Sequence, residues 1–145
     1  MSGKTVEWLA VLIFFISFFA LTYAESTWLS KRGGSPAGKS FAFSFATNIF
    51  TVVVGFTLSF AVFATLAMLA FGGAFEHLDG NDWRLWAAVI GGAVFPIILS
   101  VLAKRLGIRV FKLSTAISPW TFSVVASLIF LIVVTAAPVL FVYFA

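Results

Sequence analysis

Four long apolar stretches, separated by short polar segments, account for most of the sequence. They lie at about 8–24, 41–73, 85–103 and 120–144, and none of them contains Asp, Glu, Lys, Arg or His. About 20 apolar residues are enough to cross the roughly 30 Å hydrocarbon core of a bilayer. These runs also lack the alternating polarity of membrane β-barrel strands. We therefore predict an all-α integral membrane protein: a single domain of four transmembrane helices joined by short loops.

The second stretch is longer than a bilayer requires. As a straight helix from residue 41 to 75 it would measure roughly 50 Å at 1.5 Å per residue. We expect this helix to tilt or protrude, and to weaken at Gly72 and Gly73, because glycine is a poor helix former.

Composition supports a lipid environment. Hydrophobic residues make up 62% of the chain and charged residues 10%, and the mean hydropathy is +1.14, whereas soluble domains carry about 25% charged residues. The chain has no cysteine, which excludes disulfides and thiolate chemistry. The net charge of +4 does not indicate a nucleic-acid partner, because the cations lie in short loops between apolar runs.

The positions of the cations predict the orientation. If there are four spans, most cations fall in the first and third loops, on one side: Lys31, Arg32, Lys39, Lys104, Arg105, Arg109 and Lys112, against Lys4 and Arg84 on the other. The positive-inside rule places the basic loops in the cytoplasm and both termini outside. We expect a bacterial inner (plasma) membrane protein.

The first stretch also imitates a signal peptide, with Thr22-Tyr23-Ala24 as the small-residue cleavage site. Such peptides usually begin with a more positive segment, whereas here Glu7 offsets Lys4. We therefore expect the first helix to be retained.

The first loop matches a nucleotide-binding motif letter for letter. The segment from Gly33 to Ser40 fits the P-loop pattern G-x-x-x-x-G-K-[ST]. A working P-loop follows a strand, opens an exposed helix and needs an acid elsewhere to hold magnesium. Here an apolar helix precedes the loop and another follows, so we expect a Gly/Ser/Pro turn and no bound nucleotide.

The second loop gathers potential metal ligands: Glu76, His77, Asp79 and Asp82. Catalytic zinc usually takes three protein ligands on a rigid frame, and this loop offers one imidazole. The alternative is a solvated turn in which Asp82 caps the third helix. We favour the turn and predict no metal site.

The apolar stretches carry no ionisable residue, which narrows the possible functions. Proton relays, ion-coupled transport and voltage sensing require charged or titratable groups inside the membrane. The one histidine lies in a loop, so a buried histidine ligand for haem is ruled out as well. We predict no catalytic residues and no cofactor.

Small and hydroxyl residues recur at helical spacing inside the spans. They are Thr51, Gly55 and Ser59 on the second helix, Gly91 and Gly92 on the third, and Ser123 and Ser127 on the fourth. Such ridges let helix backbones approach closely. We expect helix packing within one bundle, with pore lining or a partner interface as the alternative. Asn48 is expected to bond a neighbouring helix, and Pro96, after the two glycines, marks a kink.

The segment from Lys104 to Ser118 has an amphipathic pattern. Viewed as a helix it places Lys104, Arg105, Arg109 and Lys112 largely on one side, as in a helix that lies in the membrane interface. We predict contacts between these four cations and anionic lipid head groups. The alternative is that they only fix the orientation.

These observations favour a non-catalytic structural or accessory subunit of a larger membrane complex, with the lipid bilayer and other membrane subunits as partners. The alternative is a homo-oligomeric channel or passive transporter for a small solute or ion, whose copies would place Thr and Ser ridges around a shared path. An enzyme is disfavoured because no acid, base or metal ligand lies at depth.

Overall fold

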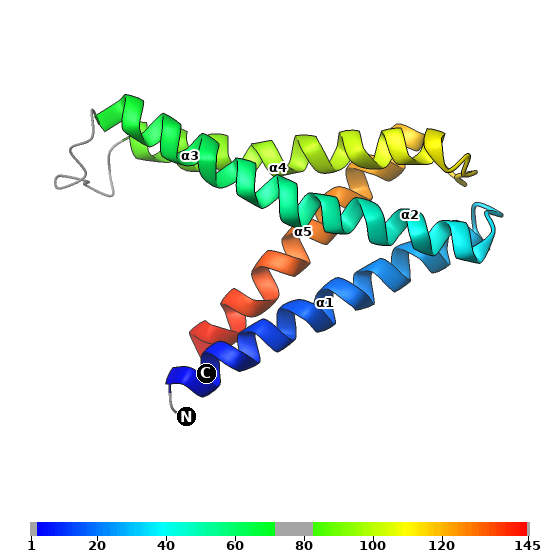
Figure 1. The fold of residues 1–145 in the computed structure, drawn as a ribbon, viewed down its shortest axis with the longest axis horizontal. Coiled ribbons are helices and arrows are strands. Elements are labelled where there is room, and N and C mark those ends of the chain that lie inside the picture. The colour runs from blue at the N-terminus through cyan, green and yellow to red at the C-terminus, as the bar shows by residue number, and fades with distance from the viewer. Residues whose placement is uncertain (1–2, 72–82, 145) are drawn as a thin grey trace.

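The computed structural model describes residues 3–71 and 83–144, and this part of the chain is helical almost throughout, with no strand. Four helical segments are long and apolar enough to cross a membrane, which confirms the predicted all-α class. Figure 1 shows them in chain order: α1 (Gly3–Lys31), α2 (Ala37–Phe50) continued by η1 (Thr51–Gly55) and α3 (Phe56–Phe71), α4 (Trp83–Val110) and α5 (Pro119–Phe144).

Two helices extend past the ends predicted for them. α1 continues beyond residue 24 to Lys31, and α4 continues beyond residue 103 to Val110. The prediction of a separate amphipathic helix over 104–118 is therefore wrong, because the first half of this segment belongs to α4. The predicted weak point at Gly72 and Gly73, and the second loop with Glu76, His77, Asp79 and Asp82, lie outside the described residues.

A single π-helical segment, η1, interrupts the second span at Thr51–Gly55. Such segments insert one wider turn into an otherwise regular helix. Gly55 at its end lies against α4: a Cβ built on Gly55 would stand 3.5 Å from the Pro96 Cβ. The proline of α4 therefore packs onto the irregular turn of the neighbouring span.

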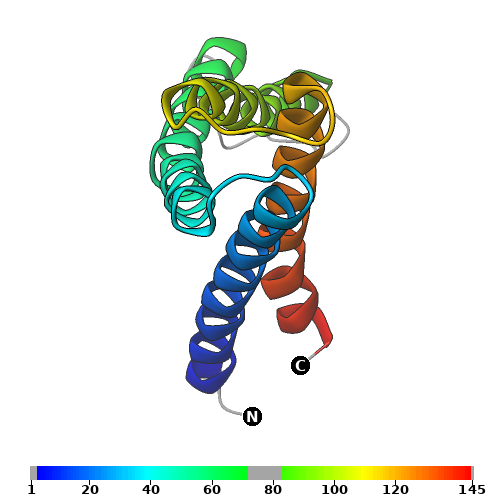
Figure 2. The ribbon, with the colours of Figure 1, turned by 90° about the vertical axis from the view of Figure 1, so that its right-hand side faces the viewer.

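The four spans form two helical hairpins that meet at one end. The first hairpin joins α1 to the second span (α2, η1 and α3), and the second joins α4 to α5. α1 packs on α2 and α5, while α4 packs on α2, η1, α3 and α5. All spans converge near the first and third loops, and towards the other end the pair α1–α5 diverges from the pair α3–α4 (Figures 1 and 2). Among the described residues α3 makes no extensive contact with α1 or α5. The bundle is therefore closed at one end and open at the other.

The second helix of each hairpin begins with the same pattern, Ser-Pro-x-x-x-Ser-x-x-x-Ser, at residues 35–44 and 118–127. Proline favours the first turn of a helix because it needs no hydrogen-bond acceptor there. One turn later, Ser40 Oγ donates to the Pro36 carbonyl (3.1 Å), and Ser123 Oγ donates to the Pro119 carbonyl (2.8 Å). The two hairpins thus share this sequence pattern and its serine–proline hydrogen bond, and both place serines in the interior.

The first and third loops bond each other at the closed end. Ser35 Oγ donates to the Ser114 carbonyl (3.0 Å) and accepts from the Ser114 amide (2.9 Å). Gly33 makes this approach possible, since a Cβ there would come within 2.3 Å of the Ser114 carbonyl oxygen. The two basic loops therefore lie side by side, as a four-span arrangement with both on one side requires.

Removal of the Ser35 hydroxyl should loosen this closure. Ser35→Ala deletes both bonds and leaves the Ser114 amide without that partner, so we expect a loss of about 1–2 kcal/mol in unfolding free energy. Thermal unfolding of the purified protein in detergent checks this. Ser30→Ala, at a partly exposed serine near the end of α1, is the control and should change little.

The small-residue ridges of the second and third spans face each other. Ser59 Oγ donates to the Gly92 carbonyl, and a Cβ on Gly92 would stand 3.1 Å from the Phe63 Cβ. A Cβ on Gly91 would meet a Leu66 methyl at 2.8 Å. Thr51, like Gly55, is buried. In the described part of the chain these small residues serve contacts between helices of one molecule.

Added bulk on this ridge should disturb the bundle more than loss of bulk outside it. Gly55→Leu pushes four new carbons toward Pro96, whereas Leu58→Ala trims a side chain that is 41% exposed. We expect a severalfold lower yield of folded protein from Gly55→Leu, measured by size-exclusion chromatography in mild detergent. Equal yields would contradict close packing at Gly55.

Candidate functional site

A lysine lies completely buried between the hairpins. The Lys104 side chain, on α4, has no exposed surface, and its ammonium donates to Glu25 Oε1 (2.8 Å), Glu25 Oε2 (2.7 Å) and Asn48 Oδ1 (2.7 Å). An ammonium has three donor hydrogens, so all three have acceptors here. The Phe130 and Phe43 rings flank it, with centroids 5.7 and 6.0 Å from Nζ. A buried cation with a full set of partners requires accurate placement of every helix around it.

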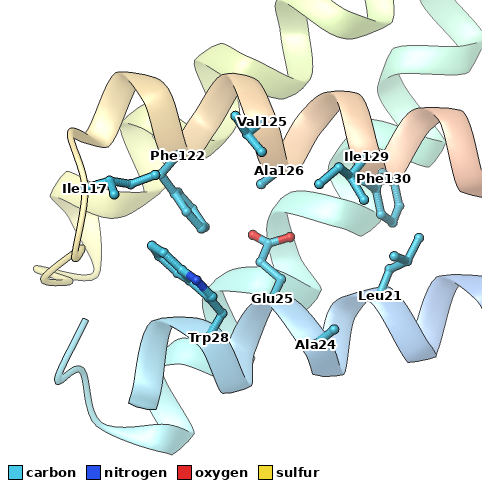
Figure 3. A pocket seen from close by; sticks show the side chains of 10 residues that line it. All are labelled: Leu21, Ala24, Glu25, Trp28, Ile117, Phe122, Val125, Ala126, Ile129 and Phe130. Carbon is cyan, nitrogen blue, oxygen red and sulfur yellow. The ribbon is translucent and has the colours of Figure 1, made fainter. Parts of the chain in front are cut away.

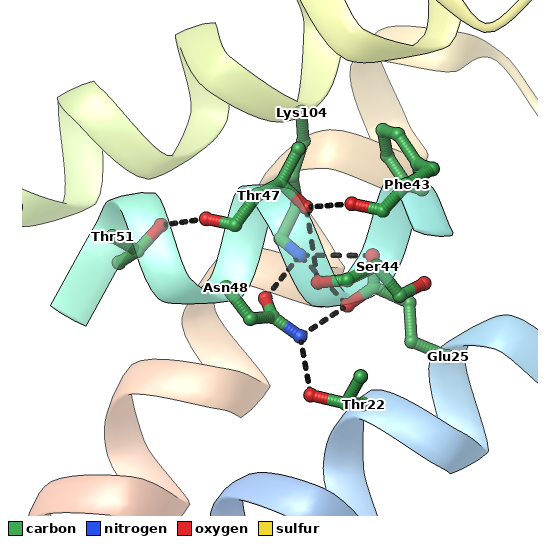
Figure 4. Close-up of polar contacts among 8 residues, drawn as sticks. All are labelled: Thr22, Glu25, Phe43, Ser44, Thr47, Asn48, Thr51 and Lys104. Carbon is green, nitrogen blue, oxygen red and sulfur yellow. Dashed lines mark hydrogen bonds and ion pairs between the residues drawn. The ribbon is translucent and has the colours of Figure 1, made fainter. Parts of the chain in front are cut away.

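The partners of Lys104 come from two other helices. Glu25 and Thr22 lie one turn apart on α1, and Asn48 lies on α2. The Asn48 amide donates to Thr22 Oγ1 (3.1 Å) and to Glu25 Oε2 (3.3 Å), while its carbonyl oxygen accepts from Lys104 (Figure 4). The predicted bond from Asn48 to a neighbouring helix is thereby confirmed. We call Thr22, Glu25, Asn48 and Lys104 the polar clamp.

The polar clamp connects the first three spans, and the fourth closes over it through Phe130. The Glu25 side chain retains 8% exposure, while Thr22 and Asn48 have none. Glu25 and Lys104 lie six residues before the last residues of α1 and α4, towards the closed end of the bundle, where the first and third loops bond each other. A carboxylate and an ammonium in contact cancel each other's charge, so the site is neutral as a whole.

Hydroxyl side chains continue this polar interior in both directions. Ser40, Ser44, Thr51, Ser100, Ser123 and Ser127 are all fully buried. Several bond the carbonyl one turn earlier on their own helix, as Thr51 does with Thr47. The interior of the closed end is therefore rich in polar groups, while large apolar side chains cover much of the outer surface.

The predicted absence of ionisable groups within the spans is therefore wrong. Glu25 and Lys104 lie inside helices that are long and apolar enough to cross a membrane. The prediction ended the first span at residue 24 and the third at 103 because a charged residue follows each. These charges neutralise each other inside the bundle and so do not end the helices. The exclusion of functions that need buried charge, which rested on that absence, falls with it.

The four cations predicted to contact lipid head groups have different environments. Lys104 is buried in the polar clamp, so its ammonium faces Glu25 and not a lipid. Arg105 lies over the Trp120 ring, with its guanidinium carbon 5.3 Å from the ring centroid. Arg109 and Lys112 are exposed, and Lys112 adopts a left-handed backbone conformation with φ of 52°. Contact with anionic lipids thus remains a prediction for the last three.

The segment that matches the P-loop is a tight turn between two helices. α1 precedes it, and α2 begins at Ala37 inside the motif. Gly34 has φ of 69°, a conformation that favours glycine, and Gly33 is pressed against the third loop. Gly33 and Gly34 thus have structural roles that do not involve a phosphate.

Sequence reasoning missed Thr22 and Glu25 as site residues, and it assigned Lys104 to lipid head groups, whereas the structure pairs it with Glu25. One available signal was helical spacing: Lys104 follows Ser100 by one turn, and Asn48 continues the line of Ser40 and Ser44. The pairing itself was not available, because Glu25 and Lys104 are 79 positions apart. Comparisons with protein-family models, curated proteins and solved structures find no match to this chain.

Proposed function

We propose that this protein is a non-catalytic subunit of a larger membrane complex. The observation that supports it is the shape of the bundle: the polar clamp joins the hairpins at one end, and beyond it the pairs α1–α5 and α3–α4 separate (Figures 1 and 2). A fully satisfied ion pair favours rigidity and gives that end a fixed geometry. The open end then presents apolar helix surfaces that the other described helices leave uncovered.

The α3–α4 pair offers the most specific docking surface. A shallow groove of about 490 Å³ runs between these helices and is lined by Phe56, Ser59, Phe60, Phe63, Val89, Gly92 and Ala93. Aromatic side chains are enriched where proteins meet. We propose that a transmembrane helix of a partner subunit packs here.

Site-specific crosslinking tests the complex. A photoreactive phenylalanine analogue replaces Phe60, which is 72% exposed in the groove, or Leu106, which is 62% exposed on α4 outside it. We expect one defined partner in stoichiometric yield from the Phe60 position and none from Leu106. Purification as a single chain in native lipid discs, with no crosslink at Phe60, would overturn the proposal.

We also propose that the chain is inserted with both basic loops in the cytoplasm and both termini outside, in a bacterial inner membrane. With Lys104 buried in the polar clamp, six cations remain at the side of the basic loops, Lys31, Arg32, Lys39, Arg105, Arg109 and Lys112, against Lys4 and Arg84 on the other side, and this distribution supports the orientation. Single cysteines test it, with Ala37→Cys at the exposed start of α2 beside the first loop, Ser114→Cys in the exposed part of the third loop, and Tyr143→Cys near the C-terminus. An impermeant thiol reagent added to intact cells should label the third variant alone.

The polar interior favours a second candidate, a homo-oligomeric channel or passive transporter. The buried hydroxyls and the ion pair are groups that could line a path for a small solute. A stable homomer that increases ion or solute flux across liposomes would support this candidate, and a heteromeric partner would support the first.

A further inference from the structure

A cavity of about 320 Å³ lies between α1 and α5, on the side of Glu25. Its walls are mainly apolar and aromatic: Leu21 and Trp28 from α1, and Phe122, Ile129 and Phe130 from α5. Figure 3 shows the Glu25 carboxylate pointing from α1 into the space between these side chains. Small-molecule sites typically combine such an apolar lining with a few polar groups that fix orientation.

Glu25 is the one charged residue in the wall that the described residues form. Its ion-pair partner Lys104 takes no part in the wall, and Lys104 bonds Asn48 of α2 as well as Glu25. The cavity is therefore bounded by the negative end of a fixed charge pair. A carboxylate offers about four lone-pair positions, and three hydrogen bonds reach this one, so it can accept another donor.

Two aromatic rings close one end of the cavity. Trp28 and Phe122 stack on each other there, with ring centroids 5.2 Å apart, and Trp28 follows Glu25 by one helical turn on α1. Their facing surfaces cover each other, so they supply an apolar wall beside the carboxylate. The charge preference of the cavity therefore comes from Glu25, which favours a cation and disfavours an anion of the same shape.

We propose that this cavity binds an amphiphilic cation, with its ammonium group on Glu25 and its apolar body against Trp28, Phe122 and Ile129. The cavity is partly open between two helices that are apolar enough to lie in lipid, so the ligand enters from the bilayer. The proposal does not depend on a partner subunit and concerns the single chain.

Three probes with one apolar body test the charge preference: 4-phenylbutylammonium, 4-phenylbutanol and 4-phenylbutyrate. Binding to the protein in lipid nanodiscs is measured by calorimetry, with empty nanodiscs of the same lipid subtracted. We expect the ammonium to bind at least tenfold more tightly than the alcohol, and the carboxylate not to bind. Equal affinities of the three probes would overturn the proposal.

Variants locate the probe. Glu25→Gln with Lys104→Met removes both charges together and leaves no unpaired ion, and it should abolish the preference for the ammonium. Ala126→Leu fills the cavity but keeps Glu25, and it should weaken all binding at least tenfold. Leu106→Ala, on the exposed side of α4, is the control and should bind like the wild type. Unchanged ammonium binding in both cavity variants would overturn the proposal.

The lipid composition distinguishes two sources of the cation. In nanodiscs of phosphatidylethanolamine, a lipid ammonium would compete with the probe, whereas phosphatidylglycerol has none. Weaker probe binding in phosphatidylethanolamine assigns the site to a lipid head group. Equal binding in both lipids assigns it to a free amphiphile, and either result supports a cation site.

Discussion

Lys104→Met should strongly destabilise the folded protein. Methionine fits the space of the lysine stem but leaves the Glu25 carboxylate buried, with Asn48 as its one remaining donor. Removal of one partner of a buried ion pair costs about 3–5 kcal/mol, because the remaining charge has no compensation. Thermal or denaturant unfolding in detergent measures the loss, and Glu25→Gln alone should have a similar effect.

The double variant Glu25→Gln with Lys104→Met is the decisive control. Replacement of both charges by uncharged side chains of similar size is often neutral or stabilising. We therefore expect it to recover most of the stability that Lys104→Met loses, which would demonstrate direct coupling of the two residues. If the losses of the single variants simply add, Glu25 and Lys104 do not form the pair seen in the structure.

The existence and order of the spans follow from hydrophobicity alone, because a long uncharged run has few alternatives to a helix in lipid. The prediction placed the second span at 41–73, and helix runs from Ala37 to Phe71. Sequence patterns within the second span do not predict the π-helical turn at Thr51–Gly55. It lies where Gly55 meets Pro96 of another span, so the contact that accompanies it is not local in sequence.

The site was harder to predict because a charged residue at the edge of an apolar run has two interpretations. It either marks the exposed end of the span or lies buried inside it as one partner of an ion pair. Lys31 and Arg32 follow the first run and are exposed, as a boundary residue should be. Glu25 also follows it, yet the helix continues and the carboxylate is buried. What separates the cases is a partner 79 positions away, which no local pattern reveals.

The clamp and the cavity give Glu25 two different neighbours. On one side Lys104 and Asn48 hold the carboxylate in place, and on the other the carboxylate faces the aromatic wall between α1 and α5. A cation in that cavity would compete with Lys104 for the same oxygens, so ligand binding would weaken the contact between the hairpins. Binding and the geometry of the open end are therefore expected to be coupled.

Close helix contact at the closed end should make Gly107 nearly irreplaceable. A Cβ at this position of α4 would stand 2.7 Å from Phe43 Cε2 and 3.1 Å from Thr47 Cγ2. Phe43 is fully buried and packs against Phe111 and Phe122, so its ring has no free space to enter. We expect Gly107→Ala to lower the unfolding free energy by about 2–3 kcal/mol, as overpacking of a core does.

Helix propensity alone predicts that Gly107→Ala raises the unfolding free energy, since alanine stabilises a helix interior by about 1 kcal/mol relative to glycine. Gly38→Ala isolates that term, because Gly38 lies in the first turn of α2 with no atom within 4 Å of an added Cβ. Unfolding measurements should therefore find Gly38→Ala neutral or stabilising and Gly107→Ala strongly destabilising. If Gly107→Ala were as stable as Gly38→Ala, α2 and α4 would not approach each other as closely as the structure has them at Phe43 and Thr47, and the bond from Lys104 to Asn48 of α2 would be in question with that approach.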